Sequence, residues 1–241
     1  MYYIKLQNAV FRGEAISPTD HPALQSLARA AALCNEADLH HRDGEWVWRG
    51  DPTDIALLSM AHKLGWNREA ALERYPQDNE IPFEPEHQFA ATYHVLNNTL
   101  RVLVKGAPER VQSMCDLPPD SETTHTLQVK AEQLAGQGYR VLGLASGSAP
   151  AALAPDQAPP EPSQLTFLGL VALIDPLRAG VREAIAACHA AGIAVWMVTG
   201  DHPTTALAIA RDLGLATDLA QVVTGAELAA LATKRILSTC T

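Results

Sequence analysis

Two short apolar runs, residues 167–174 and 193–198, place the tightest constraint on the fold of this chain. Each run is continuously hydrophobic and does not alternate, which is typical of a strand covered on both faces of a parallel sheet. Each is followed by a helical pattern, over residues 181–191 and 203–213, that ends at a glycine. Because crossovers between parallel strands are right-handed, these two units predict half of an open parallel α/β sheet.

A different pattern, in which helices mix with short alternating strands, precedes these runs. Asp51 can cap a helix whose first turn accommodates Pro52, so a helix is predicted to begin there. Two alternating runs flank Asn97 and Asn98, which predicts a β-hairpin. The other predicted elements are helices over 22–34 and 124–134 and from residue 108, strands over 45–49 and 140–145, and a last helix opened by the capping box of Thr224 and Glu227.

A proline-rich stretch separates the two patterns. Residues 146–164 hold several prolines among alanine and serine, so an extended and poorly packed connection is predicted there. The predicted fold is therefore α/β, with an α+β domain over residues 11–146, a linker over 147–164, and a partial Rossmann-like domain over 165–241.

Charge and composition exclude several classes of function. The net charge of −9 and the pI near 5.4 argue against binding to nucleic acid or to an anionic membrane surface. No apolar run approaches the roughly 20 residues that cross a bilayer, and the first residues lack a signal-peptide pattern, so the isolated chain is expected to be soluble. The four cysteines are scattered without a CxxC pair, which predicts neither a disulfide framework nor a metal site.

Polar residues follow both apolar runs. Residues 175–178 (DPLR) come after the first run, and residues 199–201 (TGD) come after the second. Ligands of open parallel sheets bind at the carboxyl ends of the strands, and a hydroxyl beside a glycine amide at a helix start suits a phosphate. The alternative is that Asp175 and Asp201 only cap the helices that follow.

Two further positions in the first region could contact a nucleotide. Lys105 ends a predicted strand beside Gly106, a combination that suits a polyphosphate, although nothing here matches a Walker loop. Phe83, at a boundary between loop and strand, could stack on an adenine. The alternatives are a solvated lysine in a turn and a phenylalanine that fills the core.

Four segments in the same order resemble one family, the P-type ATPases. Residues 105–109 (KGAPE), 50–54 (GDPTD), 175–178 (DPLR) and 197–201 (MVTGD) look like the KGAPE, G-[DE]-P-T-[ED], DPPR-type and M-[IV]-TGD motifs of that family. The resemblance runs from about residue 11 to residue 231 and is greatest for the type II group, which includes calcium pumps. It identifies residues 11–146 as a nucleotide-binding domain and residues 165–241 as part of a phosphorylation domain of the haloacid-dehalogenase type.

The resemblance also implies roles for individual residues. Phe83 matches the aromatic residue that stacks on adenine, Asp54 the acid near the adenine amino group, and Lys105 the pocket lysine beside Gly106. Arg140 matches an arginine that reaches the phosphates, and Leu142 lies near the base. The positions that match support for the phosphate and the hinge are Asp175, Arg178, Thr199, Gly200 and Asp201.

Departures from the family pattern limit what this chain is expected to do alone. Gln88 stands where a second pocket lysine is expected, which should weaken the hold on phosphates. The DKTGT motif with the phosphorylated aspartate and the GDGxNDxP magnesium motif are absent from the sequence. The chain is thus expected to bind ATP or ADP without hydrolysing ATP.

The resemblance implies a parent pump at the cell membrane that transports a cation through an aspartyl phosphate with Mg²⁺. Its other parts, the phosphorylation-site segment, the actuator domain and the transmembrane helices, would be this chain's partners, and the chain would lie on the cytoplasmic face.

Two other functions are compatible with parts of the sequence. The TGD strand end also occurs in free-standing haloacid-dehalogenase-type phosphohydrolases, but these need an N-terminal DxD strand that residues 1–20 do not contain. A nucleotide-sensing regulatory module without catalysis is the other alternative.

Overall fold

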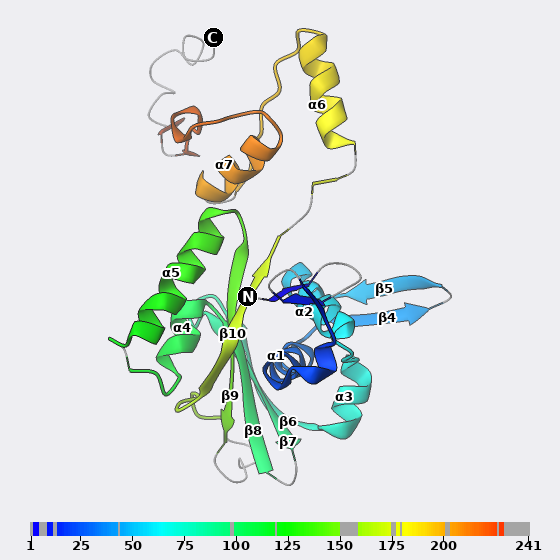
Figure 1. The fold of residues 1–241 in the computed structure, drawn as a ribbon, viewed down its shortest axis with the longest axis vertical. Helices are drawn as coiled ribbons and strands as arrows, with labels where there is room; N and C mark the ends of the chain where they lie inside the picture. Colours follow the sequence, from blue (N-terminus) through cyan, green and yellow to red (C-terminus); the bar gives the residue numbers. More distant parts are fainter. Residues whose placement is uncertain are drawn as a thin grey trace. The chain divides into compact units, whose positions relative to one another are not determined.

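The structure is a computed structural model that describes residues 2–4, 9–11, 14–42, 44–96, 99–118, 120–149, 159–174, 177–178, 180–200, 203–225 and 227–228. Figure 1 shows the elements, which in chain order are β1 (Tyr2–Ile4), β2 (Ala9–Phe11), β3 (Glu14–Ile16), η1 (Pro18–Asp20), α1 (Pro22–Leu33), β4 (Asp38–Arg42), β5 (Glu45–Arg49), α2 (Pro52–Lys63), α3 (Arg68–Arg74), β6 (Gln77–Glu84), β7 (Phe89–Leu96), β8 (Thr99–Gly106), α4 (Pro108–Ser113), α5 (Glu122–Gly136), β9 (Arg140–Ser148), β10 (Thr166–Leu173), α6 (Val181–Ala190), α7 (Pro203–Asp212) and η2 (Leu219–Gln221).

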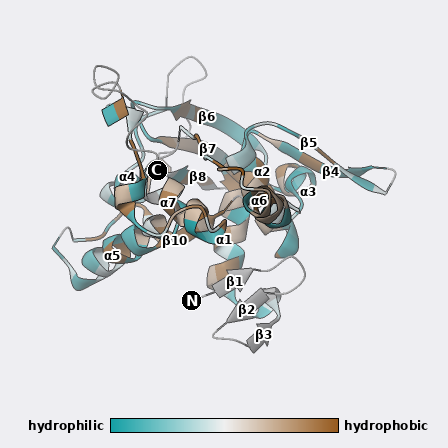
Figure 2. Ribbon diagram, turned by 90° about the horizontal axis from the view of Figure 1, so that it is seen from above, coloured by the Kyte–Doolittle hydropathy of each residue, from teal (hydrophilic) through white to brown (hydrophobic). Residues whose placement is uncertain are grey.

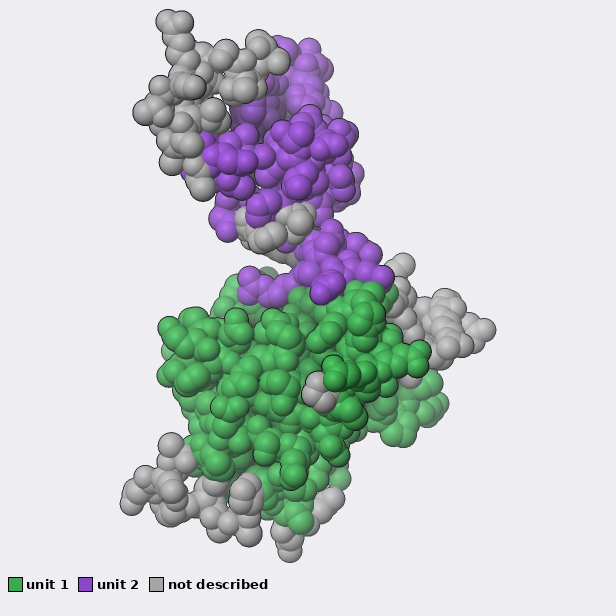
Figure 3. Space-filling model, turned by 90° about the vertical axis from the view of Figure 1, so that its left-hand side faces the viewer, with its two compact units in different colours: residues 1–131, 141–173 green, residues 132–140, 174–241 purple. Residues whose placement is uncertain are grey.

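The chain divides into two compact units. Unit 1 comprises residues 1–131 and 141–173, and unit 2 comprises residues 132–140 and 174–241 (Figure 3). This division differs from the predicted one, which placed the boundary at residues 147–164. The difference arises because β10, predicted to open the second domain, belongs to unit 1.

The main sheet of unit 1 has five strands in the order β10-β9-β8-β7-β6. Strands β6 to β9 pair antiparallel with their sequence neighbours. Strands β7 and β8 are in register from Phe89 opposite Gly106 to Leu96 opposite Thr99, so the hairpin predicted around residues 97 and 98 is confirmed. Strand β10 adds to the free edge of β9. The predicted α/β class is confirmed, with helices packed on an antiparallel sheet.

Helices cover both faces of this sheet because its strands alternate apolar side chains. Leu103 of β8 points into a core shared with α1, α2 and α3, whereas its neighbours Val102 and Val104 join a second core with Val111 of α4. Figure 1 shows α1 to α3 on one side of the sheet and α4 on the other. The alternation thus places Lys105, two residues after Leu103, on the face of α1 and α2.

The start of α2 is as predicted. Asp51 is its N-cap, and the Asp51 carboxylate accepts a hydrogen bond of 2.8 Å from the amide of Thr53, with Pro52 in the first turn. This cap fixes where the helix begins, and hence where Asp54 lies.

The predicted poorly packed linker is wrong at both described ends. Strand β9 continues to Ser148, and residues 159–165 are attached to unit 1. The Tyr93 hydroxyl donates to the Pro160 carbonyl at 2.9 Å, Arg110 pairs with Glu161 at 2.7 Å, and Leu165 is buried. Proline content indicated an extended backbone but not these side-chain partners. Residues 150–158 lie outside the described residues.

Unit 2 contains the predicted helices α6 and α7 but not the predicted strand over residues 193–198. From residue 174 to residue 228 the described residues contain no strand, and Val198 is 95% exposed. A strand needs a neighbour for its backbone groups, and β10, its predicted neighbour, pairs with β9. The predicted capping box is confirmed, because the Thr224 amide donates to Glu227 at 2.8 Å and the Glu227 amide donates to Thr224 at 3.3 Å.

Buried His94 of β7 predicts a loss of stability in acid. Its ring is fully buried, with Nδ1 2.9 Å from the Tyr75 carbonyl oxygen, and burial lowers its pKa from the usual value. The unfolded chain therefore binds a proton first, so the free energy of unfolding should fall as pH drops below about 6.5, by up to about 1.4 kcal/mol per pH unit. Urea unfolding from pH 7.5 to 5 measures this. A His94→Gln variant with the same slope as the wild type would contradict it.

Candidate nucleotide-binding site

The loop that follows α1 leads into β4 and is hydrogen-bonded to the first turn of α2. Asn35 is buried, and its side-chain amide donates to the carbonyl of Asp54 at 3.0 Å and to that of Ala31 at 3.2 Å. Its side-chain oxygen accepts from the Ala37 amide at 2.9 Å. One side chain therefore holds the end of α1, the loop and the start of α2 together.

Asp54 and Lys105 form a buried ion pair at this junction. Asp54 in α2 is 8% exposed, Lys105 in β8 is 7% exposed, and the Lys105 ammonium contacts the Asp54 Oδ1 atom. The other carboxylate oxygen accepts a hydrogen bond of 3.0 Å from the Glu36 amide. Because both charges are removed from water, each depends on the other and on these polar contacts for its stability.

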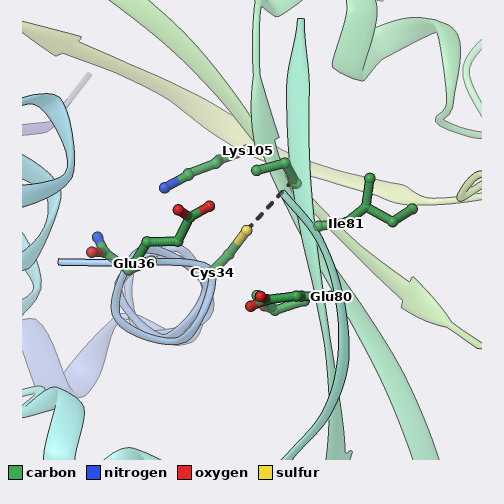
Figure 4. A pocket seen from close by; sticks show the side chains of 9 residues that line it. Cys34, Glu36, Glu80, Ile81 and Lys105 are labelled. Atoms are coloured by element: carbon green, nitrogen blue, oxygen red, sulfur yellow. Dashed lines mark hydrogen bonds between the residues drawn. The ribbon is translucent and has the colours of Figure 1, made fainter. Parts of the chain in front are cut away.

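A small recess of about 170 Å³ opens beside the pair, between α1 and the sheet. Figure 4 shows the side chains of Cys34, Glu36 and Lys105 converging on it, with Glu80 of β6 across from them. This volume includes open solvent, and the recess encloses no space for even a water-sized molecule, so a ligand would lie over its mouth and not inside it. Its lining residues are Cys34, Asn35, Glu36, Glu80, Ile81, Ala90, Ala91, Thr92 and Lys105.

Acidic side chains outnumber basic ones at this recess. Glu36 and Glu80 are exposed at its rim, and the charge of Lys105 is already compensated by Asp54. Lys105 was predicted to suit a polyphosphate, but its ammonium contacts the Asp54 carboxylate. A phosphate at the recess would be repelled by Glu36 and Glu80, whereas a group that donates hydrogen bonds would be favoured.

Phe83 lies on a β-bulge next to the recess. Strand β6 pairs Ile81 with Ala91 and Glu84 with Phe89, so Pro82 and Phe83 together face the single residue between Ala91 and Phe89. That residue, Ala90, lines the recess and pairs with Lys105. The Phe83 ring is 56% exposed, which excludes the alternative that it fills the core.

Gly106 is required by the packing of the chain itself. A Cβ atom at this position would lie 2.8 Å from the Phe89 Cα atom and would also collide with the Gln88 carbonyl oxygen. The space that a side chain would take at this position is therefore occupied by the chain around the start of β7 and is not left for a ligand. Gln88 has a left-handed backbone with φ of 60°, and its carbonyl accepts the Ala107 amide at 2.9 Å.

Of the other predicted site residues, Leu142 belongs to unit 1 and does not line the recess, and the rest belong to unit 2 or lie outside the described residues. Leu142 of β9 is half-buried against the core shared with α1, and Arg140, the first residue of β9, is exposed. Arg178, Thr199 and Gly200 are exposed residues of unit 2. Asp175 and Asp201 lie outside the described residues.

Sequence reasoning missed the recess residues Cys34, Asn35, Glu36 and Glu80. The only local signal was an asparagine directly after an Ala/Leu-rich helix, which is typical of a helix end. Burial raises the pKa of the Cys34 thiol to about 11, so this cysteine stays protonated and packs as a small apolar residue.

Comparison with known proteins decides the family of the chain. The sequence profile described as "P-type ATPase, cytoplasmic domain N" matches residues 23–180. The chain belongs to the P-type ATPase family.

Individual relatives agree with this assignment. The chain is 40% identical over 221 residues to the "Probable cation-transporting ATPase F" of Mycobacterium tuberculosis, a match that covers 87% of this chain and 24% of the relative. It is 36% identical to the "Calcium-transporting ATPase" of Bacillus subtilis, with the same shares covered, and 32% identical to the human "Calcium-transporting ATPase type 2C member 1", with 95% and 24% covered. The chain thus spans about a quarter of the length of these relatives. No helix among the described residues is long and apolar enough to cross a membrane.

Proposed function

We propose that this chain is the nucleotide-binding part of a cation-transporting P-type ATPase and that it holds the base of ATP or ADP at the recess beside Lys105. The observation that carries the proposal is the buried Asp54–Lys105 pair beside a recess whose lining residue Ile81 lies two positions before the exposed Phe83 on β6. A buried ion pair adds little to stability compared with apolar packing. Its presence next to an exposed aromatic ring therefore supports a binding role.

The recess suggests a division of roles among its residues. Phe83 provides a flat face for a base, and Asp54 and the rim carboxylates of Glu36 and Glu80 accept hydrogen bonds from an amino group. Lys105 holds Asp54 in place by direct contact. The phosphates then extend away from this acidic rim. Gln88 lies at the end of the turn that follows Phe83 and supplies no positive charge for these phosphates. ATP and ADP are therefore expected to bind weakly.

The activity of the whole protein is proposed by extension from the relatives. Their printed names describe cation-transporting and calcium-transporting ATPases. The parent is proposed to hydrolyse ATP through an aspartyl phosphate with Mg²⁺ and to move a cation. The nucleophile and the magnesium ligands would come from other segments of the pump, because DKTGT and GDGxNDxP are absent from this sequence.

Phe83→Ala is expected to weaken binding of ATP, ADP and AMP by a similar amount, about 1–3 kcal/mol, because the base loses its stacking partner. Wild-type binding is expected to be about −4 to −6 kcal/mol, since one ring and a few partly exposed polar groups must offset the cost of association. Titration calorimetry, with NMR for the weakest complexes, measures both values.

Two further variants sharpen this test. Val95→Ala removes an exposed apolar side chain from the other end of β7 and should leave binding unchanged. Gln88→Lys adds a positive charge to the turn after Phe83 and should tighten ATP more than AMP, with a gain that shrinks in salt. The proposal fails if several millimolar ATP perturbs no resonance around Phe83 in the wild type.

A further inference from the structure

A two-stranded hairpin, β4 with β5, stands out from the rest of unit 1 (Figures 1 and 2). All five residues of β5 are exposed, including Trp46 at 43% and Trp48 at 63%. Among the described residues no third strand lies beside either edge of the hairpin. Such an edge presents unpaired backbone N–H and C=O groups, which can pair with another strand.

The hairpin is anchored to unit 1 in a defined orientation. The ring of Trp46 makes edge contacts with His41 across the hairpin, at 5.2 Å between centroids, and with His62 of α2 at 4.8 Å. The outer edge of β5 is therefore held in place before any partner arrives, which lowers the entropic cost of pairing.

The order of residues in β5 makes this strand complementary to itself. Its sequence is Glu-Trp-Val-Trp-Arg, from Glu45 to Arg49. When two copies pair antiparallel about a two-fold axis at Val47, Glu45 lies opposite the partner's Arg49 and Trp46 lies opposite the partner's Trp48. Opposite charges and aromatic pairs are the cross-strand neighbours that stabilise a sheet. A two-fold axis also lets the same patch serve both copies.

The internal register of the hairpin extends this complementarity. Within one copy Arg42 lies opposite Glu45, and Asp38 lies opposite Arg49. Across four strands, β4 and β5 of one copy followed by β5 and β4 of the other, the charges then alternate along each row. Charged residues usually protect an edge from pairing, but in this order they favour pairing with an identical edge.

We propose that β5 is a self-association surface, through which a second copy of this chain completes a four-stranded antiparallel sheet. Charge complementarity identifies a second copy of β5 as the strand that pairs here, because the order of residues from Glu45 to Arg49 matches its own copy at every position. The edge of β4 fits itself less well, because a two-fold axis there places His40 against the partner's His40 and Leu39 against His41. The interface is small, so the dimer should be weak, with a Kd on the order of 100 µM.

The test is sedimentation equilibrium of the full 241-residue chain at 10 µM to 1 mM. The double variant Arg42→Glu with Glu45→Arg keeps net charge and keeps opposite charges inside each hairpin. It nevertheless puts like charges opposite each other between copies, and it should weaken the dimer by about tenfold or more. Adding Asp38→Arg with Arg49→Glu restores alternating charges across the four strands, although it gives up the ion pair of Asp38 with Arg68 at 3.7 Å, and it should recover the dimer. Glu73→Arg, at an exposed site on α3, is the control and should have no effect.

Amide exchange locates the surface. Exchange at Trp46 and Trp48 should slow as the wild-type concentration rises, whereas exchange in β4 should not change. A monomer at every concentration overturns the proposal. So does a dimer that the double variant leaves intact, which would assign association to another surface, such as the edge of β4 or the exposed run 193–198.

Discussion

Replacing Lys105 with alanine is expected to lower the free energy of unfolding by about 3–5 kcal/mol. The Lys105 ammonium contacts Asp54 in the interior, and without it the Asp54 carboxylate remains buried with only the Glu36 amide as a partner. An isolated buried charge costs far more than the pair gains over apolar packing. This is the largest stability effect that we expect from one polar substitution in the described part of the chain.

Urea unfolding monitored by circular dichroism measures the loss. The double variant Lys105→Met with Asp54→Asn removes both charges, while the asparagine oxygen can still accept the Glu36 amide. It should therefore recover most of the lost stability, and the cycle built with the single variants Lys105→Met and Asp54→Asn should give a large coupling energy. If the losses in the two single variants simply add in the double variant, the two side chains do not depend on each other and the prediction is wrong.

Gly106→Ala is expected to be strongly destabilising, at the upper end of the range of about 1–3 kcal/mol for overpacking. The added Cβ atom would lie 2.8 Å from the Cα atom of Phe89, and it would also meet the Gln88 carbonyl. Both are backbone atoms, one in the first residue of β7 and one in the residue before it, so no side-chain rotation relieves the clash. Strand β7 has to move away from β8, next to the recess.

Gly136→Ala is the matched control for this substitution. Gly136 ends α5, and a Cβ atom there would meet nothing within 4 Å. Alanine should be neutral or stabilise the helix by about 0.5–1 kcal/mol, because it has the higher helix propensity. Equal midpoints of thermal unfolding for the two variants would show that packing at Gly106 is not the reason for the glycine.

Local sequence patterns predicted part of unit 1, where neighbouring residues determine an element, but they did not predict β1 to β4, α3 or β6. Asp51 and Pro52 define the start of α2 within one turn, and the alternation on either side of residues 97 and 98 defines β7 and β8. The apolar run 167–174 was predicted as a strand, and β10 is one. Its neighbour in the sheet was not predictable in the same way, because an apolar run does not encode which free edge it will join.

The candidate site was predicted only in part for the same reason. Asp54 and Lys105 each stood out as residues of interest, but their contact joins positions 51 residues apart through the packing of α2 on β8. Asn35 and Glu36 contribute through backbone and side-chain contacts that no spacing rule anticipates. The resemblance to P-type ATPases named Phe83, Asp54 and Lys105 together. The acidic rim of the recess became visible only when the loop after α1 was placed beside them.

The membership of β10 in unit 1 bears on how the chain acquires its structure during synthesis. Strand β9 has no neighbour on one side until residues 166–173 have left the ribosome, and the hydrophobic surface that Leu165 and Val171 bury stays open until then. At about 5–20 residues per second, the roughly 25 residues after β9 delay completion by seconds. In a variant that ends within the proline-rich stretch, β10 would be missing and the edge of β9 would stay uncovered. Such an apolar edge is expected to bind chaperones or neighbouring nascent chains.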